Sequence, residues 1–195
     1  MSRRVRKFLL GVLALLALGG LGGCGDSHTK VSTGTYAGES GANAPYLDVG
    51  PLTYEVQLSR QLSPFDTEDA AYLQGLSSTQ RALGPREEWF AVFMQVYNNT
   101  SASHLAASTV TISDTQGNTY APVLPDQTNQ FAYRGGTLAA DGRLPVPDSI
   151  AAAGPTQGAL LLYKIQINSL DNRPLTVRIV DPNDAAQTAS AELDV

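Results

Sequence analysis

Residues 88–98 read EWFAVFMQVYN, and this segment constrains the fold more than any other part of the chain. Apolar and aromatic side chains occupy both alternating sets of positions, whereas a strand with one solvated face would alternate apolar and polar residues. The segment therefore predicts a central β-strand that is buried on both faces, or nearly so. We expect this strand to carry the hydrophobic core.

Short apolar runs separated by Gly, Pro, Asn and Asp continue from Tyr46 to the end of the chain. The clearest run places Leu52, Tyr54, Val56 and Leu58 on one face of a strand, alternating with polar residues. Further strands are expected at 109–114 and 119–123, which form a hairpin, and at 131–133, 159–167, 175–180 and 191–195.

One short helix is expected at the start of this region. Asp66 is a good N-cap residue, acidic residues follow it in the first turn, and Gly75 suits the end of the helix. Seven or eight strands with this one helix predict an all-β fold, an Ig-like β-sandwich over residues 46–195.

Residues 135–157 form a connection far longer than those expected elsewhere, and they include Pro145, Pro147 and Pro155. Long loops at the ends of rigid sandwiches often carry recognition, and the prolines reduce the entropy cost of ordering such a loop against a partner. Alternatively, its apolar residues cover the open end of the core; these are Leu138, Leu144, Val146 and Ile150. Both interpretations stay open.

The start of the chain has the pattern of a targeting segment. Four basic residues precede an eleven-residue apolar run at 8–18, which is too short to span a membrane. The run leads to Leu21-Gly22-Gly23-Cys24, which resembles the lipobox of bacterial lipoproteins. This resemblance implies that residues 1–23 are a signal peptide and that Cys24 is lipidated. The alternative is an ordinary secretory signal with an accidental cysteine.

A lipidated Cys24 implies a protein held on the extracytoplasmic face of the cell membrane, because each buried acyl CH₂ contributes about 0.8 kcal/mol. Residues 24–45 are rich in Gly, Ser, Thr and Ala, so beyond Cys24 we expect a flexible linker. Cys24 is the only cysteine of the chain, so no disulfide is expected.

The charge balance argues against nucleic acid as a partner. The chain has 13 basic and 18 acidic residues, and removal of residues 1–23 would leave 9 basic residues against the same 18. Nucleic-acid binding depends on a basic face. The mature protein is therefore expected to be strongly acidic, with a membrane partner through the lipid on Cys24 and a partner of unknown identity for the folded domain.

Three segments resemble one family of secreted bacterial domains of unknown function. They are 89–99 (WFAVFMQVYNN), the hairpin residues 112–114 and 117–120, and 158–163 (GALLLY). The family comprises Ig-like sandwiches related to small extracellular immunogenic antigens, often found on lipoproteins, and the likeness covers about residues 88–181. The chain departs from it by adding 52–75 and by lengthening 135–157.

Residues able to support catalysis or bind a metal are few. His104 is the one histidine of the expected domain, and its place beyond a strand end is typical of a surface or turn residue. Asp66, Glu68 and Asp69 could bind calcium, but the same residues explain a capped helix start. Trp89 is more typical of a core residue than of a sugar-stacking platform. We therefore expect no catalytic site, no metal and no cofactor.

Two functions follow from these observations. The first is a non-catalytic, lipid-anchored module that binds a protein or an envelope component. The second is a binder of a small extracytoplasmic ligand such as a sugar or a lipid. An exposed apolar patch on a sheet would favour the protein partner, and an apolar pocket with a few polar groups would favour the small ligand.

Overall fold

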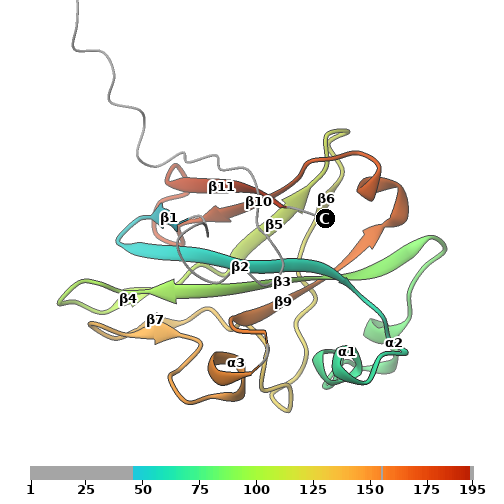
Figure 1. Cartoon of the computed structure of the whole chain (residues 1–195). Coiled ribbons are helices and arrows are strands. Elements are labelled where there is room, and N and C mark those ends of the chain that lie inside the picture. Colours follow the sequence, from blue (N-terminus) through green and yellow to red (C-terminus); the bar gives the residue numbers. More distant parts are fainter. Residues whose placement is uncertain (1–45, 155, 194–195) are drawn as a thin grey trace, which may run out of the picture.

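The computed structural model describes residues 46–154 and 156–193, and these form two facing β-sheets (Figure 1). The first sheet contains β1 (Tyr46–Val49), β2 (Leu52–Leu62), β3 (Glu87–Tyr97), β8 (Arg143–Leu144) and β9 (Ala159–Gln166). The second sheet has the order β11 (Thr188–Leu193), β10 (Leu175–Val180), β5 (Thr109–Ser113) and β6 (Thr119–Tyr120). A separate two-stranded ladder joins β4 (His104–Leu105) to β7 (Thr137–Leu138).

The inner core lies between the two sheets. It includes Phe90 and Val92 of the first sheet and Ile112 and Val177 of the second, all of them fully buried. The protein is therefore an all-β sandwich, as the sequence predicts. Of the strands in the described part, seven have four or more residues, and the four others, β4, β6, β7 and β8, have two each.

The central strand β3 is buried on both faces, which confirms the prediction for residues 88–98. Alternate residues such as Phe90 and Val92 face the inner core. The intervening Trp89, Ala91 and Phe93 face a second apolar cluster on the opposite side of the first sheet, here called the outer cluster. Trp89 is 1 % exposed, so it is a core residue, although it packs outside the sandwich interior.

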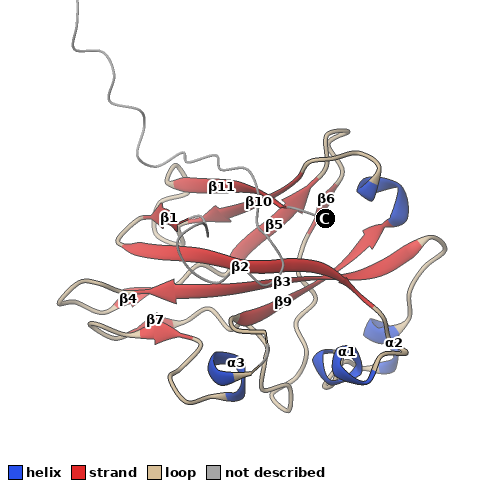
Figure 2. Ribbon diagram, in the orientation of Figure 1, coloured by secondary structure: helices blue, strands red, loops and turns tan. Residues whose placement is uncertain are grey.

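Short helices and loops cover the outer cluster. The helices α1 (Thr67–Tyr72) and α2 (Ser78–Arg81) lie on the side of the first sheet away from the second sheet (Figure 2). Asp66 caps α1 as predicted, because its side chain accepts from the N–H groups of Glu68 and Asp69. The structure adds α2, a one-turn helix with a capping box, to the single helix expected from the sequence.

The strand β2 differs from the prediction in the direction of one side chain, that of Leu58. Tyr54 and Val56 face the inner core as expected, but the pairing with β3 shifts register between Val56 and Leu58. This bulge inserts one extra residue and reverses the alternation that follows. Leu58 therefore packs against the outer cluster, and its placement on the same face as Val56 was wrong.

The hairpin expected after the central strand is present as β5 and β6. Its turn is built on Asp114, whose carboxylate accepts from the N–H groups of Gln116 and Asn118 and from the hydroxyl of Ser169. Burial raises the pKa of this carboxyl, but hydrogen bonds led by those from Asn118 and Ser169 outweigh it and lower the pKa to about 2. Residues 131–133 form no strand, only an isolated bridge from Ala132 to Leu160.

The segment 135–157 is not one continuous loop, which corrects the expectation from the sequence. It contains β7, β8 and a one-turn helix α3 (Ile150–Ala153), and β8 pairs with β3. Asn98, at the end of β3, holds the start of the segment by donating from its side-chain amide to the carbonyls of Leu138 and Ala139. Pro155 lies outside the described residues.

Some apolar residues of this segment cover the core, and others are exposed as a recognition loop would require. Leu138 is buried in the inner core, and Leu144 packs against it half-buried. Val146 and Ile150 are 61 % and 52 % exposed. The first part of the segment therefore covers the core, whereas the second part presents apolar side chains to solvent.

Two further features complete the fold. The last described strand, β11, pairs with β10 and forms an edge of the second sheet. A 3-10 helix η1 (Ile167–Leu170) follows β9. No helix in the described ranges is both long enough and apolar enough to cross a membrane.

Candidate functional site

The outer edge of β9 is closed by a loop. One side of β9 pairs with β3, and the other side faces residues 121–135, here called the edge segment. The N–H of Val123 donates to the carbonyl of Leu162 at 2.7 Å, and the N–H of Tyr133 donates to the carbonyl of Leu160 at 2.7 Å. These bonds satisfy backbone groups that an open sheet edge would leave exposed.

A buried asparagine fixes the shape of the edge segment. Asn129 is 4 % exposed, and its side-chain amide donates to the carbonyls of Tyr72 and Gln74 at 2.8 and 2.9 Å. Its side-chain oxygen accepts from the N–H groups of Phe131 and Ala132, both at 2.9 Å. Every polar atom of the Asn129 amide therefore ties the loop to itself or to the end of α1.

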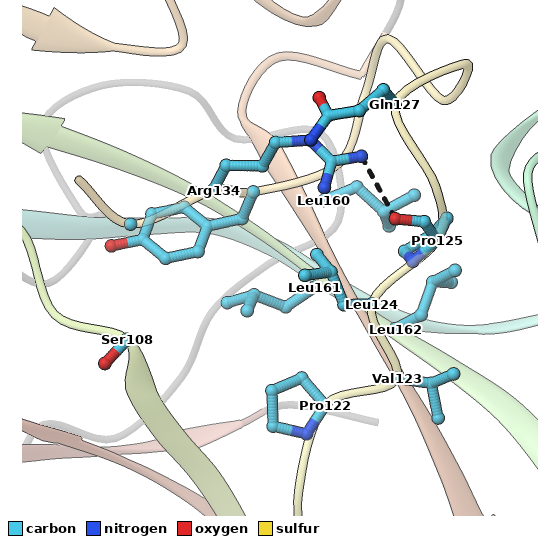
Figure 3. A pocket seen from close by; sticks show the side chains of 12 residues that line it. Ser108, Pro122, Val123, Leu124, Pro125, Gln127, Arg134, Leu160, Leu161 and Leu162 are labelled. Carbon is cyan, nitrogen blue, oxygen red and sulfur yellow. Dashed lines mark hydrogen bonds between the residues drawn. The ribbon is translucent and has the colours of Figure 1, made fainter.

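A pocket of about 400 Å³ lies between the edge segment and β9 (Figure 3). Apolar side chains dominate its lining: Pro122, Val123, Leu124, Pro125, Leu160, Leu161 and Leu162. The polar lining residues are few, with Ser108 before β5 and Gln127 and Arg134 on the edge segment. A volume of this size, an apolar lining and a few polar groups are typical of small-molecule sites.

Arg134 is the one charged residue among the described residues that line this pocket. Its Nη2 donates to the carbonyls of Pro125 and Asp126, at 3.1 and 2.5 Å, which holds the guanidinium in place beside the pocket (Figure 3). Hydrogen bonds from Thr128 lower the pKa of the neighbouring Asp126 carboxyl, and the charge of Arg134 acts in the same direction. Within the described ranges no carboxylate forms a salt bridge with Arg134.

Tyrosine hydroxyls connect the pocket to the inner core. Tyr133, which also lines the pocket, donates to the carbonyl of Ala107 at 2.7 Å. The N–H of Ala107 donates to the hydroxyl of Tyr54 at 2.8 Å, and Tyr163 donates to the carbonyl of Val110 at 3.2 Å. Burial raises the pKa of Tyr54 to about 12 and that of Tyr163 further, so these phenols are neutral at physiological pH.

The residues considered from the sequence for chemistry lie elsewhere. His104 is half-buried on β4, with its Nε2 2.9 Å from the hydroxyl of Thr100, and it does not line the pocket. Cys24, the predicted lipidation site, lies outside the described residues. Among the described residues of the long segment 135–157, Gly135 alone contributes to the pocket lining.

The three acidic residues considered for calcium have separate partners. Asp66 caps α1, Glu68 accepts from the hydroxyl of Tyr72 at 3.1 Å, and Asp69 forms an ion pair with Arg60 of β2. Across the described residues, no group of three or more His, Cys, Asp or Glu side chains is arranged to hold a metal ion. Asp69 therefore attaches α1 to the first sheet, whereas the bonds of Asp66 and Glu68 lie within α1.

Sequence reasoning missed the pocket and Arg134. The lining residues come from three separate segments, at Ser108, 122–135 and 160–162, and none of these carries a motif that points to the others. The only local signal was the leucine run of β9, which was interpreted as a buried strand. That interpretation is correct but incomplete, because part of the run borders a cavity.

Comparisons with known proteins concern the fold. No protein-family model matches the chain, and no curated protein matches it. It is similar to the solved structure of the yjhA protein from Bacillus subtilis, at 12 % identity and a TM-score of 0.49, over 77 % of this chain and 97 % of that one.

Two other bacterial structures are similar at comparable levels. An uncharacterised β-sandwich protein from Clostridium difficile is 9 % identical, with a TM-score of 0.43, over 84 % of this chain and 95 % of that one. A candidate lipoprotein of Bacillus subtilis, ycdA, is 10 % identical, with a TM-score of 0.45. The match to ycdA covers 76 % of this chain and 38 % of that one.

Proposed function

We propose that this protein is a non-catalytic, lipid-anchored module on the extracytoplasmic face of the cell membrane, and that it binds a small apolar ligand in the pocket beside β9. The pocket carries the proposal. Its leucine and proline lining favours transfer of apolar surface out of water, and its few polar groups can orient a ligand. This combination favours the small ligand over the protein partner among the two functions expected from the sequence.

The non-catalytic part of the proposal is supported by the pocket's side chains. Histidine, cysteine and carboxylate side chains are absent from its described lining, so no lining residue there is an obvious general base or thiol nucleophile. The lining hydroxyls belong to Ser108 and Tyr133, and that of Tyr133 donates to the carbonyl of Ala107. Such a lining is therefore better suited to binding a ligand than to catalysing a reaction.

The lipid anchor and the location are supported by the leader sequence. The lipobox-like residues 21–24 place Cys24 where bacterial lipoproteins are modified, and the apolar run before them is too short to span a membrane. Membership of the Ig-like family of secreted bacterial domains, related to small extracellular immunogenic antigens, is part of the same proposal and is supported by the motifs within 88–181.

One observation favours a protein or envelope component as a second candidate partner. Val146 and Ile150 lie close together in the sequence and are 61 % and 52 % exposed, on a segment whose earlier residues are packed against the core. Exposed apolar residues on an anchored loop are suited to contact a partner. Crosslinking on intact cells, followed by mass spectrometry, would identify such a partner, and its loss in a Val146→Asp variant would support this candidate.

Native mass spectrometry tests the pocket proposal. The full-length protein, purified as its host processes it, is mixed with an organic extract of the same cells, and bound small molecules are measured. We expect a bound compound in the wild type and its loss in Leu124→Trp, because Leu124 is 56 % exposed and lines the pocket. Ile167→Trp is the matched control, since Ile167 is 45 % exposed and lies outside the pocket lining.

The proposal is overturned if the wild type carries no small molecule from the extract. It is also overturned if Leu124→Trp and Ile167→Trp retain the compound equally. Circular dichroism of both variants confirms that the β-sandwich is intact.

A further inference from the structure

We infer that the pocket beside β9 binds a compact aliphatic carboxylate, with its carboxylate on Arg134 and its hydrocarbon part on the leucines of β9. This inference rests on the proposed function of the pocket and adds the chemical class of the ligand. The observation behind it is the position of the Arg134 guanidinium, which two backbone carbonyls fix beside a cavity whose described lining is otherwise uncharged and mostly apolar.

Arg134 is positioned for a ligand before any ligand arrives. Two backbone carbonyls, of Pro125 and Asp126, accept from Nη2 and fix the plane of the guanidinium. The N–H groups on Nε and Nη1 have no hydrogen-bond partner among the described residues, so they can donate to an incoming anion. A side chain that is already held loses little further conformational entropy on binding, which favours affinity.

The charges around the pocket favour a single negative charge on the ligand. Arg134 is the one cation of the described lining, and Asp126 lies close enough for Arg134 to influence the pKa of its carboxyl. One guanidinium balances a carboxylate, whereas a phosphomonoester carries a charge of about −1.5 to −2 at neutral pH. The excess charge of a phosphate would face Asp126 on a chain that is acidic overall.

The dimensions of the pocket favour a short hydrocarbon part. Ligand sites of drug-sized molecules occupy roughly 300–1,000 Å³, and the volume of about 400 Å³ lies near the lower limit. In Figure 3 the side chain of Leu161 lies between Arg134 and Pro122, whereas Leu160 and Leu162 lie nearer to Pro125 and Val123. A short chain that extends from Arg134 along this apolar lining would bury most of its surface.

Calorimetry with two matched probes tests the inference. Hexanoate and hexan-1-ol contain six carbon atoms each but differ in charge, and each is titrated at pH 8 into the full-length, host-processed protein in liposomes. Protein-free liposomes provide the reference for partitioning. We expect the Kd for hexanoate to be about tenfold lower than that for hexan-1-ol, because a charge-assisted hydrogen bond is stronger than a neutral one.

Arg134→Gln separates the charge from the cavity. In this variant the Kd for hexanoate is expected to rise about tenfold, while the Kd for hexan-1-ol changes by less than about twofold. The unchanged binding of hexan-1-ol also shows that the variant keeps its pocket. Arg178→Gln is the matched control, since Arg178 is exposed on β10 and outside the pocket lining, and neither Kd should change.

Three results would overturn the inference: no measurable binding of hexanoate, equal affinity for the two probes, or unchanged hexanoate affinity in Arg134→Gln. Equal affinity for both probes would leave the pocket proposal standing with a neutral ligand. The pocket proposal fails separately, when the native mass spectra of wild type and Leu124→Trp are the same.

Discussion

Tyr133 donates a hydrogen bond of 2.7 Å from its hydroxyl to the backbone carbonyl of Ala107, a residue that is completely buried. The N–H of the same alanine donates to the hydroxyl of Tyr54 at 2.8 Å. Two tyrosines therefore satisfy both backbone groups of one buried residue. Because Ala107 leads into β5 and Tyr54 belongs to β2, these bonds join the two sheets beside the pocket.

Replacing Tyr133 by phenylalanine tests this connection. Tyr133→Phe keeps the ring but leaves the Ala107 carbonyl without its donor, and a buried unsatisfied group costs about 1–3 kcal/mol. The free energy of unfolding, measured by urea denaturation, is expected to fall by this amount. Tyr46→Phe is the control, since Tyr46 is 51 % exposed and should show little change. Equal effects of the two variants would contradict the structural role of the Tyr133 hydroxyl.

The buried tyrosines predict a loss of stability at alkaline pH. Burial raises the pKa of Tyr54 from 10.0 to about 12, so its contribution is fully present below pH 10 and is lost as the pH rises toward 12. Two pKa units correspond to about 2–3 kcal/mol, and the raised pKa values of Tyr133 and Tyr163 act in the same direction.

Urea denaturation at pH 8, 10 and 11 measures this loss, with Tyr54→Phe expected to show a shallower decline than the wild type. Equal declines in the wild type and in Tyr54→Phe would contradict the prediction, and so would constant stability of the wild type up to pH 11.

Trp89→Ala tests the outer cluster. Trp89 is 1 % exposed within the outer cluster, and truncation of a buried tryptophan costs about 3–5 kcal/mol. Phe65→Ala is a matched aromatic control because Phe65 is 97 % exposed, so its truncation should change stability by less than about 0.5 kcal/mol. Comparable unfolding midpoints for the two variants would contradict the burial of Trp89.

Local patterns in the sequence were sufficient for several elements of this fold. The double-faced apolar run predicts β3, Asp66 predicts the start of α1, and the turn residues after Asp114 predict the hairpin of β5 and β6. Each of these features depends on residues that are neighbours in the chain. Alternation, capping and turn chemistry therefore contain the necessary information.

Features that depend on distant contacts were not predictable in this way. The bulge that moves Leu58 to the other face is a property of the pairing with β3, and β2 alone shows regular alternation. Arg134 gains its significance from the carbonyls of Pro125 and Asp126 and from leucines more than 25 positions away in the chain. No local periodicity encodes such a pocket.

Gly158→Ala tests the close approach between β9 and β3. Gly158 has a φ of +122°, and a Cβ at this position would lie 2.9 Å from the backbone nitrogen of Met94. Backbone strain alone costs about 1–3 kcal/mol, and the steric contact adds to it, so thermal unfolding should occur at a clearly lower temperature. Gly136→Ala is the matched control because a Cβ there meets no atom within 4 Å. Wild-type stability of Gly158→Ala would contradict the described approach.

The proposed lipid anchor is tested at Cys24. Lipoprotein processing requires the thiol, which would receive a diacylglycerol group before cleavage ahead of the cysteine, so Cys24→Ser should accumulate as an unlipidated precursor. We expect the wild type to partition into the detergent phase and this variant to stay out of it, because buried acyl chains would supply membrane affinity at about 0.8 kcal/mol per CH₂. Ser27→Ala, which changes a nearby residue outside the lipobox, should partition like the wild type. Intact-mass spectrometry of the wild-type protein tests lipidation directly, since a free thiol at Cys24 or an uncleaved leader would refute the anchor.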